Sequence, residues 1–85
     1  MARLANRLQA VADAARTAGT MTAEAHAMLG SRLESARKAL AEKSTAKAVQ
    51  YLKQYADFAG HSLDSQALRD VLVSGAQALI VRLTS

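Results

Sequence analysis

Apolar residues recur every three or four positions along most of the chain, in four stretches that short polar segments separate. Residues three and four positions apart lie on one face of an α-helix, so this spacing indicates amphipathic helices. The pattern predicts four helices, over about residues 2–18, 23–42, 45–59 and 65–83. The positions expected to face the core include Leu4, Leu8, Val11, Ala15, Ala25, Leu29, Leu33, Ala36, Leu40, Leu68, Leu72, Leu79 and Leu83.

The third predicted helix has apolar residues over more than half of its circumference. It also contains every aromatic residue of the chain: Tyr51, Tyr55 and Phe58. A helix at the surface needs only one narrow apolar stripe, so we expect this helix to occupy the centre of the fold. Ser44 or Thr45 is the expected N-cap, and Gly60 is expected to end the helix in the left-handed conformation.

Residues that favour helix ends occupy the short segments between the predicted helices. Gly19 follows the first helix, Thr22 precedes the second, and Asp64 or Ser65 precedes the last. Connections this short make consecutive helices antiparallel neighbours. We therefore predict an all-α fold in a single domain spanning residues 1–85, an antiparallel up-and-down bundle of four helices.

The composition is typical of a helical protein and excludes several kinds of chemistry. The chain has no proline, no cysteine and only four glycines. Without cysteine it can form neither a disulfide nor a thiolate metal site. Gly30 and Gly75 fall inside predicted helices, where glycine costs about 1 kcal/mol relative to alanine, and close helix packing is the expected reason. No apolar run approaches the roughly 20 residues of a membrane-spanning helix, and the N-terminal segment lacks a signal-peptide core.

The residues that could support catalysis or bind a metal are few. The only histidines are His26 and His61, which an antiparallel bundle would place at the same end. A metal shared between them would need further ligands, because Zn²⁺ sites use three or four protein ligands. The candidates are ordinary capping or solvent-facing carboxylates: Glu24, Asp57 and Asp64. We therefore predict no metal, no cofactor and no enzymatic activity.

Basic residues form the first candidate interaction surface, since the chain has a formal net charge of +4. The residues expected to cluster where the second helix meets the third are Arg37, Lys38, Lys43, Lys47 and Lys53. A phosphate or an anionic polymer could bind there. No aromatic residue is expected among them for base stacking, and Glu34 and Glu42 reduce the local positive charge. A solvated charged corner is therefore the simpler interpretation, and nucleic acid is a less favoured partner.

Two tyrosines form the second candidate surface. Tyr51 and Tyr55 lie one helical turn apart. Their hydroxyls could reach the surface while their rings stay buried, and such a pair would suit a partner protein or a sugar. Packing of both rings in the core, with the hydroxyls in water, is the simpler alternative.

Three segments of the chain share a pattern of apolar spacings: AGTMTAEAHAMLGSRLESARKAL, AKAVQYLKQYADFAG and LDSQALRDVLVSGAQALIVRL. They resemble the FIMAH domain, a small helical module found mostly in secreted multidomain proteins of Gram-positive bacteria, often hydrolases. The resemblance extends from about Leu8 to Leu83. Leu52 and Tyr55 hold the places of the family's leucine and of the aromatic residue three positions after it. The family often has glycine where Lys43 stands, and usually phenylalanine where Tyr55 stands.

The resemblance implies a non-catalytic accessory domain of a larger extracellular protein, serving interaction, attachment or spacing, with a protein or an extracellular polymer as partner. The residues alone leave two other functions open. One is a free-standing cytosolic protein that self-associates or binds a partner helix through an apolar face beside the alanine-rich first helix. The other, less favoured, is a small nucleic-acid binder that uses the basic residues. The sequence does not determine the oligomeric state or the parent protein.

Overall fold

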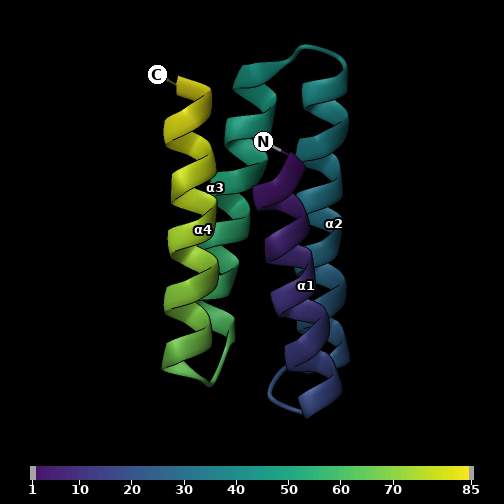
Figure 1. Ribbon diagram of the computed structural model, residues 1–85, viewed down its shortest axis with the longest axis vertical. Helices are drawn as coiled ribbons and strands as arrows, with labels where there is room; N and C mark the ends of the chain where they lie inside the picture. Colours follow the sequence, from purple (N-terminus) through teal and green to yellow (C-terminus); the bar gives the residue numbers. More distant parts are fainter. Residues whose placement is uncertain (1, 85) are drawn as a thin grey trace.

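The computed structural model describes residues 2–84, most of which belong to four α-helices (Figure 1). The helices are α1 (Ala2–Ala18), α2 (Ala23–Ala41), α3 (Thr45–Ser62) and α4 (Gln66–Thr84). Consecutive helices run in opposite directions, and both α1 and α3 pack against α2 and α4. This arrangement confirms the predicted all-α bundle of four antiparallel helices. The N- and C-terminal ends both lie toward the upper end of the bundle in Figure 1.

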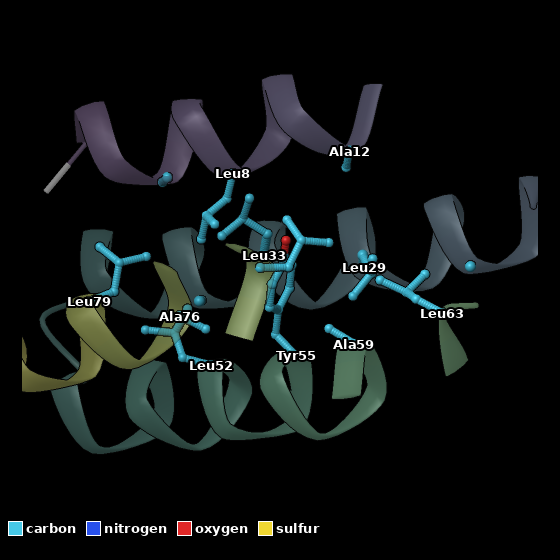
Figure 2. Packing of buried hydrophobic residues seen from close by; sticks show 14 of the residues in the cluster. Leu8, Ala12, Leu29, Leu33, Leu52, Tyr55, Ala59, Leu63, Ala76 and Leu79 are labelled. Atoms are coloured by element: carbon cyan, nitrogen blue, oxygen red, sulfur yellow. The ribbon is translucent and has the colours of Figure 1, made fainter. Parts of the chain in front are cut away.

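The core of the bundle is formed mainly by α2, α3 and α4. The largest fully buried side chains are Leu29, Leu52, Tyr55, Leu72 and Leu79. Helix α1 covers this cluster mostly with small residues (Figure 2). Among the described residues of α1, the buried side chains are three alanines and Leu8. The central position predicted for α3 is confirmed, since α3 has extensive contacts with both of its neighbours and contributes Leu52 and Tyr55.

The end of α1 lies at Gly19, as predicted. Gly19 has a φ of 79°, in the left-handed region that glycine adopts without steric cost. The Gly19 N–H donates to the Arg16 carbonyl (3.3 Å), and the Thr20 N–H donates to the Ala15 carbonyl (3.0 Å). This pair of bonds is the Schellman motif, which satisfies carbonyl groups that a helix end leaves without partners.

The end of α2 has the same motif, with a lysine in the left-handed position. Lys43 has a φ of 61°, and no other non-glycine residue in the described part of the chain has a positive φ. The Lys43 N–H donates to the Leu40 carbonyl (3.0 Å), and the Ser44 N–H donates to the Ala39 carbonyl (2.7 Å). In this conformation Cβ approaches the following carbonyl oxygen, which costs about 1–2 kcal/mol.

Replacing Lys43 with glycine should stabilise the protein. We expect Lys43→Gly to raise the free energy of unfolding by about 0.5–1 kcal/mol, because glycine removes the Cβ strain but adds freedom to the unfolded chain. Urea unfolding followed by circular dichroism measures the change. Lys53→Gly is the matched control, since Lys53 is exposed within α3 and the same change there should cost about 1 kcal/mol. A loss of stability in Lys43→Gly would contradict the strain at this position.

Side-chain hydroxyls cap the N-terminal ends of α2 and α4. The Thr22 hydroxyl accepts a hydrogen bond from the Ala25 N–H (3.1 Å), which confirms the predicted cap of α2. At α4 the Ser65 hydroxyl accepts from the Leu68 N–H (3.3 Å), so the serine, and not the aspartate before it, is the cap. Ser44 occupies the N-cap position of α3 but makes no capping bond through its side chain.

Helix α3 is longer than predicted, and the expectation that Gly60 ends it is wrong. The helix continues through Gly60 and His61 to Ser62, and the backbone becomes extended at Leu63. Glycine lowers helix propensity by only about 1 kcal/mol, so it does not by itself end a helix. Leu63 is buried, and the chain leaves the helix where this side chain enters the core. The Leu63 carbonyl also accepts a hydrogen bond from Nη1 of Arg69 (2.6 Å), which ties this connection to α4.

The two glycines inside predicted helices, Gly75 and Gly30, differ in their surroundings. A Cβ added at Gly75 would overlap Cδ2 of Leu8 and would lie 3.2 Å from its Cγ. Gly75 therefore lets Leu8 of α1 approach the backbone of α4, which is the kind of packing expected from the sequence. At Gly30 the nearest atom would be Oε1 of Gln9 at 3.8 Å, an ordinary contact, so close packing does not explain this glycine.

The two glycines should respond differently to alanine. Gly30→Ala should raise the free energy of unfolding by about 0.5–1 kcal/mol, because alanine favours the helix and its methyl group meets no close neighbour. Gly75→Ala should lower it by about 1 kcal/mol, because Leu8 must leave its place in the core. Urea unfolding measures both changes. Because both variants replace a helical glycine with alanine, they share the gain in helix propensity, and the difference between them reports the packing of Leu8. An equal gain in the two variants would show that Leu8 repacks without cost.

Candidate functional site

A hollow between α2 and α3 brings two of the predicted basic residues together with a tyrosine. Its volume is about 210 Å³. It is lined by Ser35, Lys38, Ala39, Glu42, Lys47 and Tyr51. We call it the basic hollow. It lies near the end of α2 and the start of α3, where the sequence predicted a cluster of positive charge.

Helical spacing explains why these residues meet. On α2, Ser35, Lys38 and Glu42 follow one another at intervals of three and four positions. On α3, Lys47 and Tyr51 are four positions apart, so each set lies along one face of its helix. Because α2 and α3 are antiparallel neighbours with a short connection, the end of one set lies beside the start of the other. Both lysines are exposed and Tyr51 is half-buried.

The basic hollow has the chemical groups needed to hold an anion. The ammonium groups of Lys38 and Lys47 supply positive charge and hydrogen-bond donors, and the hydroxyls of Ser35 and Tyr51 are further donors. The Tyr51 ring adds an apolar wall. Glu42 cancels part of the positive charge, which favours one carboxylate or phosphate group over a densely charged polymer.

The other basic residues predicted for this surface lie elsewhere. Arg37 donates from Nη2 to the side-chain oxygen of Asn6 (2.7 Å) and so links α2 to α1. Lys43 forms the left-handed end of α2, and neither Lys43 nor Lys53 lines the basic hollow. The structure also differs from the expectation that no aromatic residue lies among the lysines, because Tyr51 lines the hollow with two of them.

Tyr55 does not belong to this surface. Its side chain rises from α3 toward α1 in the middle of the core and is 1 % exposed (Figure 2). The hydroxyl is buried and has no hydrogen-bond partner among the described residues. Burial raises the pKa of Tyr55 to about 12, because the phenolate is disfavoured away from water. The predicted platform of Tyr51 with Tyr55 is therefore wrong, and so is the alternative with both hydroxyls in water.

Removing the Tyr55 hydroxyl while keeping the ring should stabilise the protein. We expect Tyr55→Phe to raise the free energy of unfolding by about 1 kcal/mol, because the hydroxyl loses its bonds to water on folding and gains none in the core. Tyr55→Ala should instead cost about 2–4 kcal/mol through the cavity that it leaves. Urea unfolding at neutral pH measures both changes. A loss of stability in Tyr55→Phe would show that the hydroxyl has a stabilising partner.

The raised pKa gives the Tyr55→Phe comparison a second readout, at alkaline pH. The unfolded state releases the phenol proton near pH 10, whereas the folded state keeps it up to a pKa of about 12. Between these values the unfolded state therefore binds fewer protons, and stability falls as the pH rises. Wild-type protein should lose stability relative to Tyr55→Phe over this range, and parallel curves for the two proteins would contradict the burial of the hydroxyl.

The two histidines have separate partners. Nε2 of His26 lies 2.6 Å from Oδ1 of Asp13 and joins α2 to α1. The hydrogen bond with His26, followed by one from Gln9, holds the pKa of Asp13 below its ordinary value, because both favour the carboxylate. Nδ1 of His61 lies 2.8 Å from the backbone oxygen of Asp57. The shared site considered from the sequence does not form, and the described part of the chain contains no group of three or more potential metal ligands.

A second hollow lies along the same pair of helices, and the sequence pattern did not indicate it. Its volume is about 330 Å³. It is lined by Met28, Arg32, Gln54, Asp57, Phe58, His61 and Ser62. We call it the aromatic hollow. Tyr51 and Phe58 are seven positions apart, so they lie on the same side of α3, about 10 Å apart along its axis. This seven-residue spacing is the sequence feature that could have identified the pair.

A third surface lies on the opposite side of the bundle, in a groove of about 360 Å³ between α1 and α4. Its lining is Arg7, Leu8, Val11, Val71, Ser74, Gly75 and Ala78. Val71 is 50 % exposed, and Val81, further along α4, is 63 % exposed. Helix α4 therefore has apolar side chains on its outer face as well as on the face that it buries.

Comparison of this chain with protein-family models, with curated proteins and with solved structures found no match. The resemblance to the FIMAH domain therefore stays a prediction. Among the described helices, none combines the length and the apolar character that a membrane span requires. The fold and its surfaces define a small all-α bundle.

Proposed function

We propose that this chain is a non-catalytic interaction module, an accessory domain of a larger secreted bacterial protein, and that it binds an anionic group of a protein or an extracellular polymer. The observation that carries the binding proposal is the basic hollow, where Lys38, Lys47 and Tyr51 line one space. The resemblance to the FIMAH domain is what supports a secreted parent protein.

An anion in the basic hollow would be held from two helices. Lys38 comes from α2 and Lys47 from α3, and a hydrogen bond between an ammonium group and an anion is stronger than one between neutral groups. Both lysines are exposed, so water and salt screen their charges and reduce the energy of each contact. A single site of this kind binds weakly.

Weak binding suits an accessory domain. When a weakly binding module is linked to another domain that acts on the same partner, the second contact becomes intramolecular, and the effective concentration raises the overall affinity. A polymer with repeated anionic groups would also offer the module many equivalent positions. The basic hollow therefore fits a role in attachment or positioning better than a role that needs tight binding by the module alone.

The use of the polar residues supports a non-catalytic role. Thr22 and Ser65 cap helices through their hydroxyls. His26 and Arg37 link α2 to α1 through their contacts with side chains of that helix. Each of these groups stabilises the bundle, and none is arranged as a nucleophile beside a general base, which is the arrangement that covalent catalysis requires.

Binding of inorganic pyrophosphate tests the basic hollow. Lys47→Ala should weaken this binding about fivefold, because it removes one of the two ammonium groups. Titration followed by NMR of the backbone amides measures the affinity and shows which residues respond. Lys53→Ala is the matched control, because it removes the same charge from an exposed position of α3 outside the hollow. Equal weakening in both variants would mean that net charge, and not the hollow, attracts the anion.

A second candidate function is self-association or the binding of a partner helix, as a free-standing cytosolic protein. The exposed side chains of Val71 and Val81 favour it, together with the mostly apolar groove between α1 and α4. Amphipathic helices bind in such grooves through apolar side chains spaced along one face. Sedimentation equilibrium distinguishes self-association from binding of a partner helix. Self-association makes the mean mass rise with protein concentration, whereas a chain that binds only a different partner keeps the mass of one copy.

A further inference from the structure

We propose that the groove along α2 and α3 binds an extended, mildly acidic glycan. In this proposal Tyr51 and Phe58 support two sugar units that are separated by one further unit, and the basic hollow holds a carboxylate or phosphate substituent of the same chain. The inference rests on the proposed function, because the basic hollow is one end of the groove. It adds the aromatic hollow and names the chemical class of the polymer.

The two hollows form one continuous side of the bundle. On α2, Met28 and Arg32 line the aromatic hollow. Ser35, three positions after Arg32, lines the basic hollow. This spacing places all three on one face of the helix, and Tyr51 and Phe58 form the corresponding face of α3. Since α2 and α3 pack side by side along their length (Figure 1), the two hollows lie in line between the same two helix faces, and together they are the proposed groove.

The aromatic side chains are held in a way that suits sugar rings. Tyr51 and Phe58 are both half-buried and pack against the core. Each ring therefore has a fixed position while part of it remains open to its hollow. The C–H groups on the face of a sugar ring lose contact with water when they pack on such a ring, which is favourable. The separation of about 10 Å along α3 is close to the length of a disaccharide.

The polar residues of the aromatic hollow match the hydroxyl groups of a sugar, which both donate and accept hydrogen bonds. The side-chain amide of Gln54 can do both, the Asp57 carboxylate accepts, and the Arg32 guanidinium donates. All three line the hollow around Phe58. An apolar surface with a few polar groups at its edge is the usual composition of sites for small polar ligands.

The charges of the groove favour a glycan over a single-stranded nucleic acid. Lys38, Lys47 and Arg32 are cationic, but Glu42 and Asp57 lie in the same two hollows. Grooves for single-stranded nucleic acids follow the backbone with positive charge, because every nucleotide brings a phosphate. The two carboxylates would repel such a backbone. They would accept hydrogen bonds from sugar hydroxyls, and the lysines would still attract an acidic substituent.

Isothermal titration calorimetry with a hexasaccharide in which one uronic acid alternates with one neutral sugar tests the inference. A neutral hexasaccharide of the same linkage and an oligothymidylate of similar length are the comparison probes. At physiological salt the acidic glycan should bind most tightly, the neutral glycan more weakly, and the oligothymidylate weakest. Phe58→Leu keeps an apolar side chain but removes the ring, so it should weaken binding of both glycans about fivefold. It should leave pyrophosphate binding at the basic hollow unchanged.

A second variant avoids the core. Phe58 also packs against buried residues, whereas Gln54 is exposed and lines the aromatic hollow. Gln54→Ala should weaken glycan binding about threefold through the lost hydrogen bonds. Gln50→Ala is the matched control, because Gln50 is an exposed glutamine one turn earlier on α3 and lines neither hollow. Glycan affinity that is unchanged in Gln54→Ala and Phe58→Leu would overturn the assignment of the groove.

The remaining outcomes separate this inference from the proposed function. If pyrophosphate binds at the basic hollow but neither glycan binds, the glycan inference is overturned and the anion site stands. If both glycans bind equally and Lys47→Ala has no effect on pyrophosphate, the anion site is overturned and the aromatic hollow stands as a neutral sugar site. Tighter binding of oligothymidylate than of the acidic glycan would overturn the glycan in favour of a single-stranded nucleic acid.

Discussion

The largest side chains without exposure to solvent come from three of the four helices: Leu29, Leu52, Tyr55, Leu72 and Leu79. Full burial of a side chain of this size contributes about 1.5–3 kcal/mol, whereas the alanines that fill many other buried positions remove little apolar area from water. A domain this small has only a modest net stability, so these five residues supply a large part of what offsets the entropy of folding. Their packing fixes α2, α3 and α4 relative to one another, and with them both hollows on the outside of α2 and α3.

Both hollows are built on helices, so their side chains start from fixed backbone positions and a ligand need not order a loop when it binds. For the proposed function, this arrangement favours modest but selective binding through only a few contacts. The groove between α1 and α4, with Val71 at its edge, lies on the opposite side of the bundle. The two faces do not overlap, so a ligand bound in the proposed groove of α2 and α3 would leave the groove between α1 and α4 accessible.

Helix positions could be predicted from the sequence because the 3.6-residue period belongs to each helix alone. Caps such as Thr22 are equally local. The end of α3 could not be predicted, because it depends on Leu63 entering a core that the other helices build. Prediction of the site was limited for the same reason. Tyr55 and Phe58 differ from Tyr51 by only about 40° and 20° in their direction around the axis of α3. Which of them reaches the surface depends on where α2 lies, and the spacing within one helix does not contain that information.

The first helix presents mostly alanine to the core, and this has a consequence for its alignment. Alanines on successive turns look alike, so a shift of one turn, about 5.4 Å, would exchange one for another with little change in buried area. The contacts that distinguish one alignment from the next are Leu8 on Gly75, Asn6 with Arg37, and Asp13 with His26. These contacts form in only one alignment of α1, so they select a single register. A chain that lost these contacts would stay helical and compact while α1 sampled neighbouring registers. Such a chain would have no single position of α1 relative to the other three helices.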